Sequence, residues 1–318
     1  MISRRILRIK VLQTIYSYYQ KGDANLIAAE KELAYSIAKS YDLYFYIMQL
    51  AIDVCDHANK QLQAAMRKHL SSETDKNPNM KFVNNSFIAQ LRDNVDLQKH
   101  INATKLTWSV NPEVPKSVYE ELIASEEYAE YMSHSKPSYD ADKWIVSFMI
   151  EKIVLDNNKF YDALSDQSIY WIDTAEFFIG MVLRTFARMK ESSSPEYKLM
   201  PMYKSDDDRT FAIQLLHTAV GRREEYRKRI SDNAQNWDLD RIAFLDIIIL
   251  QTAIAEIEQF PEIPLRVTFN EYIELAKNYS TEKSPTFVNG ILDKIVQGLT
   301  QEGRINKIAE MPTQYSNQ

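Results

Sequence analysis

Glycine is scarce in this chain, and this scarcity restricts the possible folds more than any other feature of the sequence. The 318 residues include only 6 glycines and 10 prolines. Turn-rich β architectures need many residues that adopt positive φ or fixed turn conformations. The sequence therefore predicts helices throughout. The length allows one large core or two smaller ones, and we expect two helical lobes.

The overall composition is that of a folded protein with a mild excess of negative charge. Hydrophobic residues make up 45% of the chain and charged residues 26%, with a net charge of −6. A protein that coats nucleic acid through general basicity needs an excess of Lys and Arg. Any RNA binding is therefore expected to be local. Cys55 is the single cysteine, which excludes an intramolecular disulfide and fits a reducing cytosol.

Neither a signal peptide nor a membrane span is expected. Arg8, Lys10 and Gln13 interrupt the apolar character of the N-terminal segment. No uncharged apolar run, residues 247–255 included, approaches the roughly 20 residues that cross a bilayer. These features predict a cytoplasmic protein.

Local signals place several helix boundaries. Ser3 is a plausible N-cap for a first helix that runs to Gln20, and residues 26–70 are also expected to be helical. A polar, proline-bearing break at residues 192–208 places the main boundary near residue 205.

After this break, one amphipathic helix is predicted from residue 206 to about 230, and a centrally buried helix at residues 241–260. Thr268 and Glu271 have the spacing of a capping box. Ser284 and Pro285 are predicted as the N-cap and first residue of a last core helix.

One C-terminal segment carries a family resemblance. Residues 263–294, IPLRVTFNEYIELAKNYSTEKSPTFVNGILDK, resemble the C-terminal signature of the NusB family, in which a proline precedes NEAIELAK and then FVNGVLDK. The first helix resembles the family's arginine-rich start, RR-x-x-R-x-x-x-x-Q-x-L-Y, through Arg4, Arg5, Arg8, Gln13 and Tyr16. The resemblance covers residues 3–22 and 206–300.

The resemblance implies an all-α fold: a NusB-like bundle of two packed helical subdomains with an additional helical insertion. On this basis the expected organisation has four parts. Residues 1–22 are the arginine-rich first helix, residues 23–205 the insertion, residues 206–300 the C-terminal helical core and residues 301–318 a polar tail. The insertion is rich in aromatic side chains, for which core packing is favoured over a binding surface. They include Tyr41, Tyr44, Phe45, Tyr46, Tyr119, Tyr128, Tyr131 and Trp144.

The first helix is a candidate RNA-binding element. Arg4, Arg5 and Arg8 lie where the helix dipole disfavours cations, by about 0.3 to 1 kcal/mol each. Spacing alone is compatible with a solvated cationic helix start, whereas the resemblance implies contact with boxA RNA, with Tyr16 as a nearby aromatic. Lys10 is added from its charge alone.

A second candidate RNA surface is the start of the last core helix, residues 281–287, where helix amides point outward. The resemblance implies RNA contacts here, and the candidates are Lys283, Ser284, Thr286 and Phe287. Thr286 replaces a lysine common in the family, and Lys283 stands where an acidic residue is common. Phe287 fits the core equally well.

Asp246 is the candidate for partner binding, because a carboxylate within an apolar helix needs solvent, a cap or a partner. The resemblance implies a contact with the ribosomal protein NusE. An internal salt bridge to Arg241 or Arg222 remains the alternative.

Neither metal chemistry nor catalysis has a candidate constellation. The histidines do not pair at metal-ligand spacing, and glycine-rich phosphate loops are absent. The five histidines are His57, His69, His100, His134 and His217. We therefore expect no cofactor, no metal and no enzymatic activity.

The function implied by the resemblance is transcription antitermination. In this interpretation the chain binds boxA-like single-stranded RNA together with NusE, joins the RNA polymerase antitermination complex and supports ribosomal RNA transcription. Two alternatives stay open: a protein-only scaffold or homodimer, and a NusB-like module of an RNA-modifying system.

Overall fold

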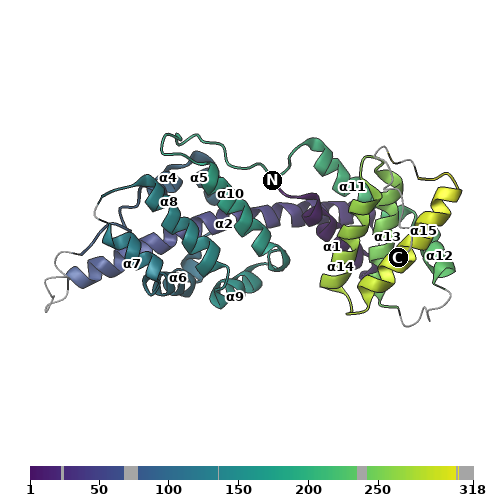
Figure 1. Cartoon of the computed structure of the whole chain (residues 1–318), viewed down its shortest axis with the longest axis horizontal. Coiled ribbons are helices and arrows are strands. Elements are labelled where there is room, and N and C mark those ends of the chain that lie inside the picture. The colour runs from purple at the N-terminus through teal and green to yellow at the C-terminus, as the bar shows by residue number, and fades with distance from the viewer. Residues whose placement is uncertain (23–24, 68–77, 135, 235–241, 306, 308–318) are drawn as a thin grey trace, which may run out of the picture. The chain divides into compact units, whose positions relative to one another are not determined.

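A computed structural model describes residues 1–22, 25–67, 78–134, 136–234, 242–305 and 307 (Figure 1). Within these residues every regular element is a helix, which confirms the all-α prediction. The α-helices are α1 (Arg4–Gln20), α2 (Leu26–Met66), α4 (Ser86–Asp93), α5 (Val95–Thr104), α6 (Glu113–Ile123), α7 (Glu126–Ser133), α8 (Tyr139–Phe148), α9 (Asn158–Gln167), α10 (Ala175–Arg188), α11 (Asp206–Gly221), α12 (Arg223–Asn233), α13 (Phe244–Gln259), α14 (Leu265–Tyr279) and α15 (Ser284–Gln301). Two 3-10 turns, Trp108–Val110 and Ile172–Thr174, and a π-helical segment, Met149–Val154, complete the list.

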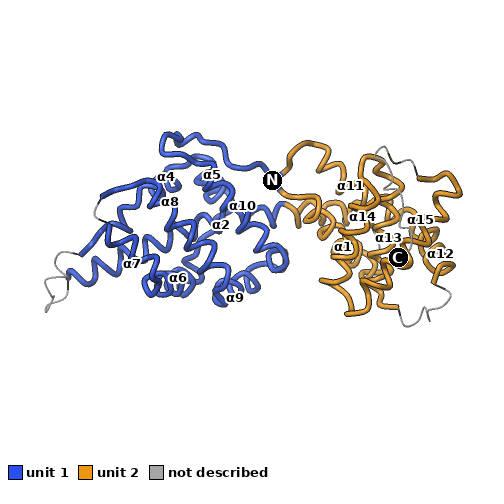
Figure 2. Tube along the Cα trace, in the orientation of Figure 1, with its two compact units in different colours: residues 1, 38–202 blue, residues 2–37, 203–318 orange. Residues whose placement is uncertain are grey.

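The chain divides into two compact units (Figure 2). Unit 1 comprises residue 1 and residues 38–202, and unit 2 comprises residues 2–37 and 203–318. The first boundary falls within α2 and the second in the segment before α11. The sequence analysis placed these boundaries at 22/23 and 205/206.

Unit 1 has an aromatic core around the part of α2 that belongs to it. Tyr46 on α2 stacks on Trp108 with ring centroids 3.9 Å apart, and the Trp108 indole N–H donates to the Tyr46 carbonyl at 2.9 Å. Tyr44 and Phe45 are also buried, so most of the aromatic side chains of this region pack internally. Trp144 on α8 is an exception, because it is substantially exposed.

Unit 2 is built around α13, whose residues 248–257 are all buried. Helices α1, α11, α12, α14 and α15 pack against it (Figure 1). An almost completely apolar helix needs burial on every side, and five neighbours supply it. At the start of α1, the Ser3 hydroxyl accepts a hydrogen bond from the Ile6 amide, as an N-cap does.

Three local expectations for unit 2 are wrong. The helix expected from residue 206 to 230 is two helices, α11 and α12, separated at Arg222. The proposed capping box does not form, since α14 begins at Leu265 and the Thr268 hydroxyl donates to Glu256 on α13 instead. Ser284 is the first residue of α15 rather than its N-cap.

Candidate nucleic-acid interface

Two of the predicted arginines lie at the surface of unit 2, at the start of α1. The Arg5 guanidinium makes two hydrogen bonds of 2.9 Å to the Glu271 carboxylate on α14, and its side chain is 54% exposed. The hydrogen bonds that Arg5 donates to Glu271 are the main cause that raises the pKa of Arg5. Arg4 pairs with Asp208 at 3.2 Å and with Glu262 at 3.5 Å. Both arginines thus have acidic partners but remain accessible.

Arg8 is buried instead, at 3% exposure, and binds the fully buried Glu256 through two hydrogen bonds of 2.7 and 2.9 Å. Thr268 and Tyr272 also donate to this carboxylate, at 2.8 and 3.2 Å. Burial acts to lower the pKa of Arg8, but the hydrogen bonds and charge of Glu256 outweigh it and the pKa is raised. Burial and the nearby Glu256 raise the pKa of Tyr272 well above its usual value. Arg8 therefore lies in the interior of unit 2, whereas the sequence predicted that it contacts RNA.

Three other predicted RNA-binding side chains are also buried in unit 2. Lys10 is almost fully enclosed, with its amino group 3.4 Å from the Gln13 side-chain oxygen. Ser284 and Phe287 are buried at the start of α15, whereas Lys283 and Thr286 beside them are exposed. The accessible members of the predicted set are Arg4, Arg5, Tyr16, Lys283 and Thr286.

Asp246 links two elements that the sequence analysis treated separately. Its Oδ2 atom accepts a hydrogen bond of 2.8 Å from the Ser284 hydroxyl, so the first turn of α13 holds the start of α15. The Ser284 oxygen in turn accepts from the Thr281 amide at 3.1 Å. Among the described residues, the buried Asp246 Oδ1 atom has no hydrogen-bond partner.

The salt bridge considered as an alternative for Asp246 is not made with Arg222, which pairs with Glu258 at 2.9 Å. Arg241, the other suggested partner, lies outside the described residues. Because Asp246 is only 4% exposed, its carboxylate is directed into unit 2 rather than toward solvent.

The far end of α1 lies beside the start of α13. Tyr16 is 42% exposed, and its ring centroid is 5.9 Å from that of Phe244, the first residue of α13. Phe244 is two residues before Asp246, whose carboxylate accepts the hydrogen bond from Ser284 of α15. Arg5 is eleven residues before Tyr16, or about 17 Å along the helix at a rise of roughly 1.5 Å per residue. Arg4 and Arg5 thus lie at the start of α1, and Tyr16 lies toward its end.

Sequence reasoning missed Phe244, the aromatic neighbour of Tyr16 and Tyr19, and Arg223, the arginine neighbour of Tyr19. Phe244 is 6.3 Å from Tyr19, measured between ring centroids, and the Arg223 guanidinium lies 4.2 Å from the Tyr19 ring centroid. The position of Tyr19 three residues after Tyr16 indicated a shared face of α1. No sequence signal linked these residues to α12.

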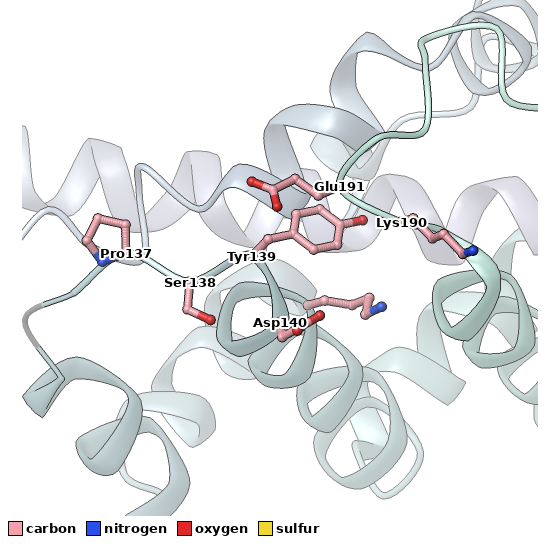
Figure 3. A pocket seen from close by; sticks show the side chains of 7 residues that line it. Pro137, Ser138, Tyr139, Asp140, Lys190 and Glu191 are labelled. Carbon is pink, nitrogen blue, oxygen red and sulfur yellow. The ribbon is translucent and has the colours of Figure 1, made fainter.

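A separate polar pocket of about 370 Å³ lies in unit 1 (Figure 3). Figure 3 shows the Tyr139 ring in the middle of the pocket, between Glu191 and Asp140. The Tyr139 hydroxyl donates to Gln90 at 2.7 Å, and the Lys143 amino group donates to the Met189 carbonyl at 3.1 Å. These groups serve to join α8 to neighbouring segments.

The described residues offer neither a metal site nor a membrane-spanning helix. They contain no group of three or more His, Cys, Asp or Glu side chains arranged to hold a metal ion. Within the same residues, no helix is both long and apolar enough to cross a membrane.

The helical fold and the geometry of unit 2 define an all-α protein with a small helical bundle around one buried helix. The model of the NusB family matches residues 180–297. Transcription antitermination protein NusB of Salinibacter ruber is 40% identical over 108 residues, which cover 34% of this chain and 68% of that protein. The chain belongs to the NusB family.

Other relatives agree with this assignment. The protein of the same name from Frankia casuarinae is 40% identical over 111 residues, or 35% of this chain and 82% of that protein. The Geotalea daltonii protein is 41% identical over 90 residues, or 28% of this chain and 62% of that protein. No solved structure matches the chain. These matches cover 28% to 35% of the chain, and the family model includes only residues 180–202 of unit 1.

Proposed function

We propose that this chain is a transcription antitermination factor that binds boxA-like single-stranded RNA together with NusE and acts in the cytoplasm without catalysing a reaction. The observation that carries the proposal is its identity of 40% with two proteins named transcription antitermination protein NusB, over 68% and 82% of their lengths. Recognition in this proposal takes place on unit 2, where most of the family match lies.

The accessible residues suit an unpaired RNA strand. Arg4 and Arg5 supply guanidinium groups for phosphates, and Tyr16 offers a partly exposed ring on which a base can stack. Lys283 and Thr286 flank the start of α15, where free backbone amides also favour an anion. The acidic partners of Arg4 and Arg5 compete with phosphate, which makes binding by this chain alone weak and salt-sensitive.

In this proposal NusE binds near the start of α13, and its own RNA contacts strengthen the complex through effective concentration. Asp246 contributes through Ser284, because it holds the start of α15 in place. The resulting ribonucleoprotein then joins elongating RNA polymerase during ribosomal RNA synthesis.

The test is a titration of fluorescent boxA-containing single-stranded RNA and of a scrambled strand, each with and without NusE, at two salt concentrations. We expect preference for boxA, tighter binding with NusE, and weaker binding when Arg4 and Arg5 are both changed to Glu. Changing the exposed Lys228 and Lys294 to Glu gives the same charge change elsewhere and is the matched control.

Equal binding of both strands, with NusE still bound, would contradict RNA recognition and favour a protein-only scaffold. Loss of RNA binding in the Lys228 and Lys294 control as well would show that net charge, rather than the start of α1, determines affinity.

A further inference from the structure

A row of aromatic rings continues from Tyr16 across the surface of unit 2. Tyr16 and Phe244 are exposed by 42% and 36%, and their centroids are 5.9 Å apart. Tyr19 follows, with its centroid 6.3 Å from that of Phe244. We call these three residues the aromatic row. It brings together one face of α1 and the first residue of α13.

Two arginines of α12 lie at the Tyr19 end of the aromatic row. The Arg223 guanidinium stands 4.2 Å from the Tyr19 ring centroid, and Arg227 follows one helical turn later. Burial raises the pKa of Tyr19, and the positive charges of Arg223 and Arg227 act in the opposite direction. The carboxylate of Glu224 is 3.8 Å from Arg223 and largely exposed, so it neutralises this charge only weakly.

The aromatic row is held in position from beneath. The Gln251 side-chain amide on α13 donates to the Tyr19 hydroxyl at 2.5 Å and to the Ala219 carbonyl on α11 at 2.6 Å. Phe244 is the first residue of α13, and its ring lies against those of Tyr16 and Tyr19. A preorganised surface loses little side-chain entropy when a ligand binds.

Exposed rings beside cationic side chains are the arrangement that binds unpaired nucleic acid. Bases of a single strand stack on aromatic rings, while the arginines contact phosphates or stack in turn. The bases of an RNA duplex already stack on one another, so they cannot stack on protein side chains.

We propose that the aromatic row, with Arg223 and Arg227, is a second contact region for single-stranded RNA that carries the strand from α1 onto α12. The choice of RNA as ligand rests on the proposed function. Phe244 supplies a stacking surface next to Tyr16, and the two arginines bind phosphates beyond it.

The test uses the full chain and unpaired oligoribonucleotides of increasing length that contain the boxA sequence. Phe244→Ala removes one ring, and Phe244→Leu keeps an apolar side chain without a π face. Each is expected to weaken binding of the longer strands about 5- to 140-fold, since stacking of one base on a ring typically contributes about 1 to 3 kcal/mol. Melting curves of both variants verify that the bundle stays folded.

A second pair of variants tests the arginines. Changing Arg223 and Arg227 to Gln is expected to reduce the slope of log affinity against log salt by about 1.4, at roughly 0.7 per phosphate contact for single strands. Arg209→Gln with Lys228→Gln removes the same charge from exposed positions of α11 and α12 and is expected to leave binding within about twofold of the wild type. Crosslinking of 4-thiouridine RNA, read by mass spectrometry, should label Phe244.

Three outcomes would overturn the proposal. If the variants of Phe244, Arg223 and Arg227 bind RNA like the wild type while the Arg4 and Arg5 variant binds weakly, the second contact region is absent and the proposed function stands. If these variants lose NusE but retain RNA, the aromatic row is a protein interface. If the wild-type chain binds no unpaired strand with or without NusE, both proposals fail.

Discussion

Arg5 and Arg8 lie three residues apart on α1, yet their surroundings give them different physical roles. The Arg5 ion pair is largely exposed, and such pairs typically contribute less than about 1 kcal/mol to stability. The Arg8 pair with Glu256 is enclosed, so each charge depends on the other for the hydrogen bonds that water would supply. Arg5 therefore forms a surface ion pair, whereas Arg8 forms an ion pair in the interior.

Replacing Arg8 by Met should strongly destabilise unit 2. The substitution leaves the Glu256 carboxylate buried without its cationic partner, and the expected loss in the free energy of unfolding is about 3 to 5 kcal/mol. Urea denaturation followed by circular dichroism measures this loss. Arg5→Met is the matched control, with an expected change below about 1 kcal/mol; equal effects of the two substitutions would contradict the assignment of Arg8 to the interior.

Cys55 should react very slowly with thiol reagents in the folded protein. Its side chain is buried in unit 1, and burial raises the pKa of the thiol to about 11. At pH 8 only about one thiol in a thousand is then the reactive thiolate, compared with about one in four for an ordinary cysteine. Reaction with a chromogenic disulfide, followed with and without denaturant, measures the difference. Rapid labelling under native conditions would show that Cys55 is accessible.

Sequence reasoning identified the arginines of α1 but not their partners. Arg8 meets Glu256, which is 248 positions away, and Arg5 meets Glu271, which is 266 positions away. Charge and spacing along one helix carry no information on contacts at such separations. The resemblance to a family supplied a function for all three arginines, while burial, which depends on the whole bundle, distinguishes Arg8 from the other two.

At the scale of elements, sequence signals predicted helix ends correctly where the capping hydrogen bond involves only residues of the same helix end. Ser3 caps α1 as expected, because an N-cap hydrogen bond needs only neighbouring residues. The Thr268 capping box failed because tertiary contacts offered its side chain a stronger acceptor. A hydrogen bond to the buried Glu256 carboxylate is charge-assisted and roughly twice as strong as a neutral one.

The hydrogen bond between Ser284 and Asp246 should stabilise the junction of α13 and α15. Ser284→Ala removes the donor to the buried carboxylate, and we expect a loss of about 1 to 3 kcal/mol in the free energy of unfolding. Asp246→Asn keeps an acceptor for Ser284 and removes the buried charge, so its effect should be smaller. A larger effect of Asp246→Asn in chemical denaturation would contradict this account.

At the scale of the whole molecule, one helix belongs to both compact units. α2 begins in unit 2 and continues into unit 1, with the division between residues 37 and 38. The sequence suggested a boundary at residue 22, where Gly22 follows α1 with a φ of +70°. A glycine turn marks the end of a helix but not the end of a core. The residues of α2 before residue 38 add to the core of unit 2 through Leu33 and Ile37, which are buried.

Unit 2 should fold when residues 38–202 of unit 1 are removed. Its helices surround α13 and provide a core of their own, which is the usual condition for an independent domain. We propose replacing residues 38–202 with a flexible linker of glycine and serine. The shortened chain is expected to show helical circular dichroism, one cooperative melting transition and the RNA affinity of the full chain. A chain that stays helical but melts without cooperativity would show that unit 2 needs unit 1 for its packing, whereas cooperative melting with weakened RNA binding would assign part of the binding surface to the insertion.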